Sequence, residues 1–294
     1  MRRILVVLLP FCMPCAAASV ADVATDEDSV LARYPLTEES LQQWDLPSTL
    51  AEISGLAVSD DGRLLAVDDE QAIVYELNYD DGRLVKAFAF GERRTLRGDF
   101  EGIAWLENQV YLVTSDGTIY IAREGADGER VSFSSHRTGV GRDCEIEGLA
   151  TDPARQLLLL LCKRAVPGSD LSNPLIFHWS IADRTIEWPR RTELPLAAIE
   201  TALGSSGFRP SGIARAMSGE RWLIVAARER AVIEIDRQGR LIAARTLPLA
   251  ERHRQAEGIE LLADGRLLIA DESRGRPARL SVYRPLPDAI MISP

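Results

Sequence analysis

Acidic side chains stand next to a recurring glycine in this chain. The phrase acid-x-(Ser/Glu)-Gly-(Ile/Leu)-Ala occurs, whole or altered, five times. The residues directly before the glycine are Ser54, Glu101, Glu147, Ser211 and Glu257, and those two positions earlier include Glu52, Asp99 and Glu145. Carboxylate oxygens are hard ligands that suit calcium, which takes about six to eight of them in loose geometry. These residue types favour a cation site if the fold brings the repeats together.

The spacing of the repeat predicts the fold. The glycines are Gly55, Gly102, Gly148, Gly212 and Gly258, separated by 47, 46, 64 and 46 residues. After each glycine comes a short apolar stretch, a turn such as Asp61-Gly62, and a second apolar stretch. A third stretch and a more polar fourth one then alternate as half-buried strands do. Four antiparallel strands in about 46 residues, repeated in series, are typical of a β-propeller.

We therefore predict an all-β chain that forms a single propeller of five four-stranded antiparallel blades. Six blades remain open, because the long third interval has room for a degenerate blade. The last unit lacks a fourth strand, so we expect the segment 31–47 to supply it and to close the ring. Helical periodicity is confined to residues 196–203. The predicted domain is 34–287, preceded by a flexible segment, 19–33, and followed by a tail, 288–294.

The first eighteen residues read as a signal peptide. Arg2 and Arg3 precede an apolar stretch that ends in small residues suited to cleavage. That stretch falls short of the ~20 residues that span a bilayer, so we expect no stable membrane insertion. The prediction is a periplasmic or secreted protein. Lipid attachment at Cys12 or Cys15 stays an open alternative.

Net charge limits the partners. The chain carries a formal charge of −10, and removal of residues 1–18 takes away two arginines and no acid, which gives −12. Nucleic acid binding needs a concentrated positive surface, so this composition excludes nucleic acid as the expected partner. The sequence predicts a monomer that binds an unidentified small ligand or protein.

The predicted topology places the acids at one mouth of the ring. The innermost strand starts, and the second strand ends, at the same face near the axis, where Asp68-Asp69-Glu70 and Asp271-Glu272 also fall. Crowded carboxylates need protons, bases or a cation. We expect calcium bound by Glu101, Glu147 and Glu257. Around that site we expect Glu52, Ser54, Asp99, Glu145, Ser211 and Asp271.

Two alternatives to the metal remain. The acids can face outward into solvent, or basic residues near the mouth can pair with them. The basic candidates are Arg97, Arg142, Lys163, Arg209, Arg228 and Arg254.

Cys144 and Cys162 are the cysteines that remain after signal removal, in a compartment that permits disulfides. Cys144 precedes the first strand of the third unit and Cys162 ends its second strand. With the turn at Asp152-Pro153, antiparallel pairing brings them side by side or diagonally, within reach of a disulfide. The alternative is a buried thiol at 162 and a partly exposed one at 144.

The phrases "DFEGIAW", "CEIEGLATDP", "RPSGIA" and "QAEGI...GRLLIADES" resemble the SdiA-regulated (YjiK-like) family of exported bacterial β-propellers. The likeness spans roughly residues 46–285. Glu101, Glu147, Ser211 and Glu257 match the motif, whereas Ser54 replaces a glutamate. The resemblance implies a propeller with a calcium site near its axis and implies little about activity.

Catalytic signals are sparse. The three histidines share no metal-ligand spacing, and His253 alone lies close enough to the repeat to serve as a general base. No Gly-x-Ser-x-Gly elbow is present. The favoured interpretation is a non-catalytic, calcium-binding module for a ligand or protein. The competing one is a calcium-dependent hydrolase of phosphate esters (phytase-like) or lactones.

Overall fold

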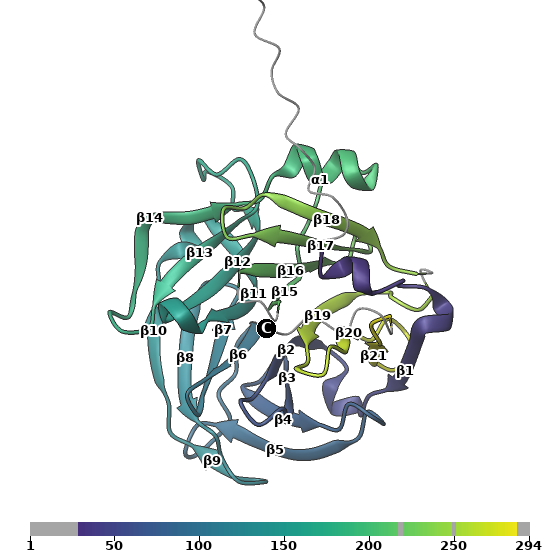
Figure 1. Cartoon of the computed structure of the whole chain (residues 1–294). Helices are drawn as coiled ribbons and strands as arrows, with labels where there is room; N and C mark the ends of the chain where they lie inside the picture. The colour runs from purple at the N-terminus through teal and green to yellow at the C-terminus, as the bar shows by residue number, and fades with distance from the viewer. Residues whose placement is uncertain (1–28, 217–219, 249–250, 287–294) are drawn as a thin grey trace, which may run out of the picture.

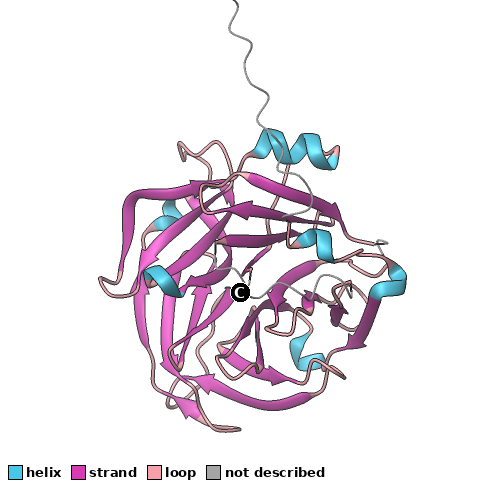
Figure 2. Ribbon diagram, in the orientation of Figure 1, coloured by secondary structure: helices cyan, strands magenta, loops and turns pink. Residues whose placement is uncertain are grey.

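The chain folds into a ring of antiparallel sheets, seen roughly down its axis in Figure 1. This computed structural model describes residues 29–216, 220–248 and 251–286. The predicted signal peptide, the tail 288–294 and residues 19–28 lie outside that range. Strands make up most of the ring and helices are short (Figure 2). Within the described ranges, no helix has the length and apolarity needed to cross a membrane.

The five sheets confirm the predicted five blades. Blade 1 contains β2 (Ile53–Val58), β3 (Leu64–Asp68), β4 (Ile73–Leu77), β5 (Leu84–Phe90) and β9 (Arg130–Val131). Blade 2 contains β6 (Phe100–Leu106), β7 (Gln109–Thr114), β8 (Thr118–Arg123) and β10 (Ser134–Arg137). Blade 3 contains β11 (Cys144–Asp152), β12 (Leu157–Ala165), β13 (Leu175–Ser180) and β14 (Thr185–Glu193).

Blade 4 contains β15 (Gly212–Arg215), β16 (Arg221–Ala226), β17 (Ala231–Asp236) and β18 (Leu241–Thr246). Blade 5 contains β19 (Ala256–Leu261), β20 (Leu267–Asp271), β21 (Arg279–Tyr283) and β1 (Leu41–Asp45). Short 3-10 turns are η2 (Leu31–Arg33), η3 (Glu38–Ser40), η4 (Ser48–Leu50), η5 (Val140–Arg142) and η6 (Pro153–Arg155).

The N-terminal strand closes the ring as predicted. β1 pairs antiparallel with β21, with Leu41 opposite Tyr283 and Asp45 opposite Arg279. The long third interval holds α1 (Leu196–Leu203) and the loops around it, so the six-blade alternative is wrong. α1 ends at Gly204, which has a φ of 63°, a left-handed conformation that glycine adopts without strain.

The second unit departs from the expected pattern. The more polar fourth stretch of this unit, residues 130–137, is divided in two: β9 pairs parallel with β5 of blade 1, whereas β10 pairs antiparallel with β8 of blade 2. Phe133, between them, packs its ring against Phe90 of blade 1 and Tyr120 of blade 2. Phe133 therefore contacts both blades at the point where this stretch divides, and it stays 37% exposed.

The core lies between the blades. Five buried clusters each join one neighbouring pair of blades, so every blade buries both of its faces. Close approach of the innermost strands explains two of the repeat glycines. A Cβ on Gly102 would lie 2.7 Å from the backbone nitrogen of Leu149, and one on Gly212 would lie 2.4 Å from the carbonyl oxygen of Glu257. Only glycine allows this spacing.

Residues 29–33 pack against the propeller. Leu31 is fully buried between blades 4 and 5. Ser29 Oγ donates to Glu234 Oε2 at 2.7 Å, and the Leu31 N–H donates to the same oxygen at 3.0 Å. Glu234 is itself fully buried, so it needs these donors together with Arg221, whose Nη1 lies 2.9 Å from Oε1. The propeller unit therefore includes residue 29.

Candidate functional site

Three of the repeat glutamates begin innermost strands of different blades. Glu101 lies in β6, Glu147 in β11 and Glu257 in β19. Glu101, Glu257 and Ser54 line a cavity of about 10 Å³ on the axis, together with the repeat glycines. That volume suits about one water-sized group. The ring therefore carries a narrow cavity at this mouth, and two glutamates and a serine are among its lining residues.

Burial and mutual repulsion raise the pKa values of these three carboxyls. Desolvation, with the charges of Glu147, Asp99 and Glu257, raises the pKa of Glu101 to about 10. Desolvation and the charge of Glu147 raise the pKa of Glu257 to about 8. Desolvation raises the pKa of Glu147 to about 7, against the lowering effect of Lys163. The three side chains thus share one electrostatic environment in which the charged form is unfavourable.

One basic residue enters this group. Lys163 Nζ, at the end of β12, lies 2.7 Å from Glu147 Oε1. Glu145, two residues earlier in β11, pairs instead with Arg164, which is more exposed. In the described part of the chain, Lys163 is the one member of the basic set named above that forms an ion pair with a ring glutamate. The salt-bridge alternative therefore holds for Glu147.

A second group of acids continues the ring toward blades 1 and 2. Desolvation and the charges of Glu52, Asp68 and Asp99 raise the pKa of Asp69 to about 7. Asp69 Oδ1 is buried and has no hydrogen-bond partner among the described residues. Glu52 and Asp99, which we expected around the metal site, therefore lie close to Asp69. We had expected Asp69 at the mouth but had not assigned it to the site.

The two serines of the repeat differ in their contacts. Ser211 Oγ donates to the carbonyl of Ala256 at 2.6 Å and accepts from the Ala227 N–H at 3.1 Å. Ser211 therefore ties blade 4 to blade 5. Ser54 Oγ is buried at the axial cavity without a partner in the described ranges. Ser54 thus retains a free oxygen at the site.

Asp271 and His253 form a separate buried group. His253 Nδ1 lies 2.8 Å from Asp271 Oδ2, and His253 Nε2 lies 2.7 Å from the Tyr283 hydroxyl. His253 is 1% exposed. Both ring nitrogens are therefore engaged inside blade 5, and the imidazole is unavailable as a general base at the mouth. Asp271, which we expected beside the metal, holds this histidine in place.

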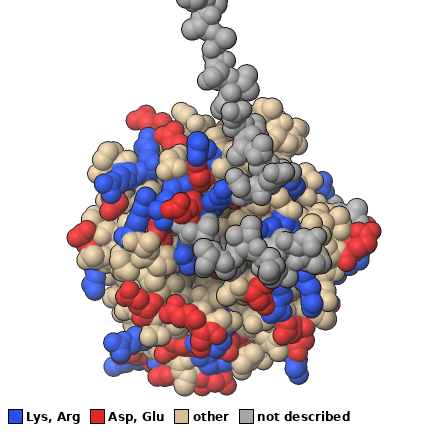
Figure 3. Space-filling model, viewed as in Figure 1, with Lys and Arg blue, Asp and Glu red and all other residues tan. Residues whose placement is uncertain are grey.

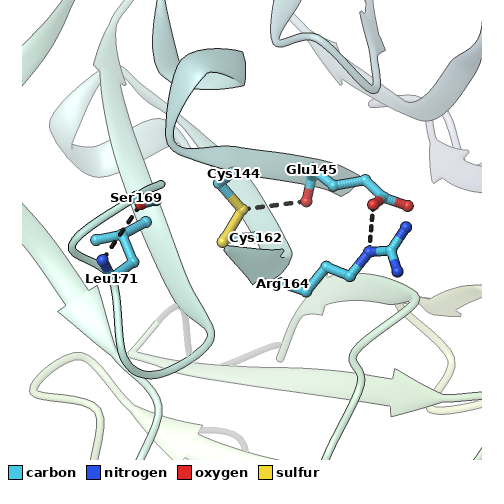
Figure 4. The surroundings of a disulfide bond; sticks show 6 residues. All are labelled: Cys144, Glu145, Cys162, Arg164, Ser169 and Leu171. Atoms are coloured by element: carbon cyan, nitrogen blue, oxygen red, sulfur yellow. Dashed lines mark hydrogen bonds and ion pairs between the residues drawn. A yellow bond between two sulfur atoms is a disulfide. The ribbon is translucent and has the colours of Figure 1, made fainter. Parts of the chain in front are cut away.

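The predicted disulfide is confirmed. Cys144 and Cys162 are bonded, with their Cα atoms 5.8 Å apart. The register pairs Ile146 with Cys162 and Cys144 with Ala165, so the two cysteines are diagonal neighbours. Figure 4 shows the disulfide beside the Glu145–Arg164 pair. The bond therefore ties together the strands that carry Glu147 and Lys163.

A cationic groove beside the ring was not predicted from the sequence. It has a volume of about 560 Å³, and its cationic walls come from Lys163, Arg164, Arg209 and Arg228, with Glu229 as the acid. The loop 165–174 and the Ser205–Gly207 turn after α1 frame it. The clustering of arginines before Gly212 and after β16 is the sequence signal that indicates it. Elsewhere on the surface, Figure 3 shows acidic and basic groups interspersed over the viewed face.

In the described ranges, no three His, Cys, Asp or Glu side chains already converge as ligands of one metal ion. The ring carboxylates repel one another and sit apart in this conformation. Their oxygens are nevertheless of the type that calcium prefers, and calcium tolerates irregular geometry. The donor set therefore matches calcium in the type of its ligand atoms.

Comparison with known proteins supports the fold. No protein-family model and no curated protein matches this chain. Glutaminyl cyclase from Myxococcus xanthus has a similar structure, with 15% identity, a TM-score of 0.56, and coverage of 82% of this chain and 93% of that one. Virginiamycin B lyase from Staphylococcus aureus shares 14% identity over 85% of this chain and 76% of that one, with a TM-score of 0.43. At this identity, the likeness to the cyclase supports the β-propeller fold and nothing further.

Proposed function

We propose that this chain is an exported, non-catalytic propeller of the SdiA-regulated type that binds calcium at its acidic mouth. In this proposal the mouth presents the ion to a small ligand or protein. The observation that supports the proposal is the mutual electrostatic influence of Glu101, Glu147 and Glu257 from three blades, with Lys163 paired to Glu147. Without calcium, the raised pKa values mean that these carboxyls hold protons, which a divalent cation would displace.

Free oxygens at the mouth support this assignment. Ser54 Oγ and Asp69 Oδ1 are buried without partners among the described residues, and such atoms cost free energy unless something binds them. Glu101 and Glu257 would hold calcium directly, and Glu147 would join them by exchanging Lys163 for the ion. The bound ion would supply a fixed positive charge that draws an anionic group of the ligand to the mouth.

The test is a calcium titration of the purified mature protein after chelator treatment. We expect elemental analysis to find calcium before treatment. At 100 times its Kd, the ion should stabilise the fold by about 2.7 kcal/mol, read as a rise in Tm. The matched variant is Glu101→Gln, which removes one carboxylate and should lose most of the calcium-induced rise in Tm. A protein that contains no metal and melts at the same temperature with and without calcium contradicts the proposal.

A second candidate rests on the groove beside the ring. Lys163, one of its four cationic side chains, also pairs with Glu147 of the acidic site. Cationic side chains beside a bound metal would suit an anionic phosphate ester. Hydrolysis of such esters is the activity that this arrangement supports. Assays with calcium-loaded protein on phosphate esters and lactones separate the two candidates. Turnover that chelator removes supports the hydrolase, whereas binding without turnover supports the module.

A further inference from the structure

The other end of the ring holds a larger pocket. Its volume is about 370 Å³, within the range of small-molecule sites. Ile103, Leu149 and Ile213 line both this pocket and the small acidic cavity, so an apolar waist on the axis separates the two. The pocket is therefore a site distinct from the calcium site proposed above.

Most of the residues that line it have apolar side chains. They come from the innermost strands and include Ala57, Ala104, Ala150 and Leu261. Trp105 also lines the pocket, is 6% exposed, and has no hydrogen-bond partner for its indole nitrogen among the described residues. Trp105 is thus an aromatic member of the wall.

Two residues that break the sequence repeat meet here. The second residue after the glycine is Ala57, Ala104, Ala150 and Ala214 in four units, but Glu260 in the fifth. The third residue is Val58, Trp105, Thr151 and Leu261 in four units, but Arg215 in the fourth unit. Both exceptions line this pocket, from the neighbouring strands β15 and β19. At each of the two positions the remaining four units carry an uncharged residue, so the innermost strand forms without a charge there.

The two charged groups do not neutralise each other by direct contact. No ion pair within 4.0 Å joins them, and Glu260 Oε1 accepts the Leu261 N–H at 2.8 Å. Burial raises the pKa of Glu260 to about 7, against the lowering effect of Arg215. Arg215 is exposed at the rim, where Asp60 is the other charged lining residue. Each group is thus placed to receive an opposite charge from a ligand.

We propose that this pocket binds a free α-amino acid with an apolar side chain. Glu260 accepts the ammonium group, Arg215 pairs with the carboxylate, and the alanine-rich wall with Trp105 surrounds the side chain. A carboxylic acid without an amine would leave Glu260 without a partner, and an amine without a carboxylate would leave Arg215 without one. A zwitterion satisfies both exceptions to the repeat.

The test uses L-leucine and isothermal titration of the full mature protein. We expect binding that weakens by about tenfold or more in Glu260→Ala and in Arg215→Val, as loss of a charge-assisted hydrogen bond requires. The same loss should appear with 4-methylpentanoate, which lacks the amine, and with isoamylamine, which lacks the carboxylate. No detectable leucine binding, or equal binding by the variants or by either analogue, overturns the proposal.

Stability serves as an independent measurement. Both substitutions install a residue type that other units carry at the same position, so we expect the Tm of each variant to match or exceed that of the parent. Glu260→Gln keeps the shape of the side chain and serves as a second variant if Glu260→Ala unfolds. Leucine binding should persist after chelation, which separates failure of this proposal from failure of the calcium site. Loss of leucine binding on chelation would assign it to the acidic mouth instead.

Discussion

Two glutamates of one strand show how strongly a single residue's surroundings set its chemistry. Glu145 and Glu147 are separated by one residue in β11. Partial burial acts to raise the pKa of Glu145, but the hydrogen bond and the charge of Arg164 outweigh it, so the pKa is lowered. Glu147 is buried and has a raised pKa beside Lys163. Glu147 is therefore the one with reason to accept a cation.

We expect Glu147→Gln to weaken calcium binding by about tenfold or more, because a carboxylate ligand is lost and Lys163 is left uncompensated at the site. Glu145→Gln should change the affinity little, since its partner Arg164 is largely solvated. Calcium titration of both variants at pH 7.5 measures the difference. Equal effects of the two substitutions would contradict the orientation that places Glu147 at the axis.

The repeat was sufficient to nominate Glu101, Glu147 and Glu257, because a residue at a fixed offset from a glycine takes the same place in every blade. It was insufficient for Asp271 and His253. Their hydrogen bonds depend on Tyr283 of the next strand, a contact that no spacing within one unit encodes. The ion pair of Lys163 with Glu147 could be named only as one of several alternatives to a metal, because it also depends on a contact between two strands that the spacing of the repeat does not encode.

At the scale of elements, the disulfide joins β11 to β12 across 18 residues. We expect replacement of both cysteines by alanine to lower the free energy of unfolding by about 3 kcal/mol, because the closed loop no longer restricts the unfolded chain. Urea denaturation with and without reductant measures this. The parent should lose stability in reductant, whereas the double variant should not respond. A parent that is insensitive to reductant would contradict the expected contribution.

Strand order was readable from the turns and the alternation of each unit, and so was α1, because its apolar period differs from that of a strand. The division of residues 130–137 into β9 and β10 was not readable. Phe133, where this stretch divides, packs on Phe90 and Tyr120 from two blades. Residues 29–33 were likewise assigned to a flexible segment, because their anchor, Glu234, lies about 200 residues away in the sequence.

For the molecule as a whole, the acidic mouth predicts an unusual dependence of stability on pH. In calcium-free protein, Glu101, Glu147 and Glu257 have folded pKa values of about 10, 7 and 8, above their ordinary value of 4.5. The folded chain then binds these protons more tightly than the unfolded chain. Their stabilising contribution is complete below about pH 4.5 and is lost as pH rises through the folded pKa values.

We therefore expect the free energy of unfolding of chelated protein to fall between pH 5 and pH 9 by at least about 1.4 kcal/mol, the value of one pKa unit. Saturating calcium should remove most of this decline, because the ion replaces the protons. Urea denaturation at several pH values, with chelator or with calcium, measures both curves. A chelated protein that is equally stable at pH 5 and pH 9 would contradict the electrostatics of the ring.

The pairing of β1 with β21 has a consequence for synthesis. The ribosome makes β1 first among these strands and β21 last, so β1 has no complete partner strand until residue 283 has been added. A nascent chain that stops early leaves β1 with unpaired backbone groups on a ring that stays open. The pairing of β1 with β21 can therefore form only in a product that extends through residue 283.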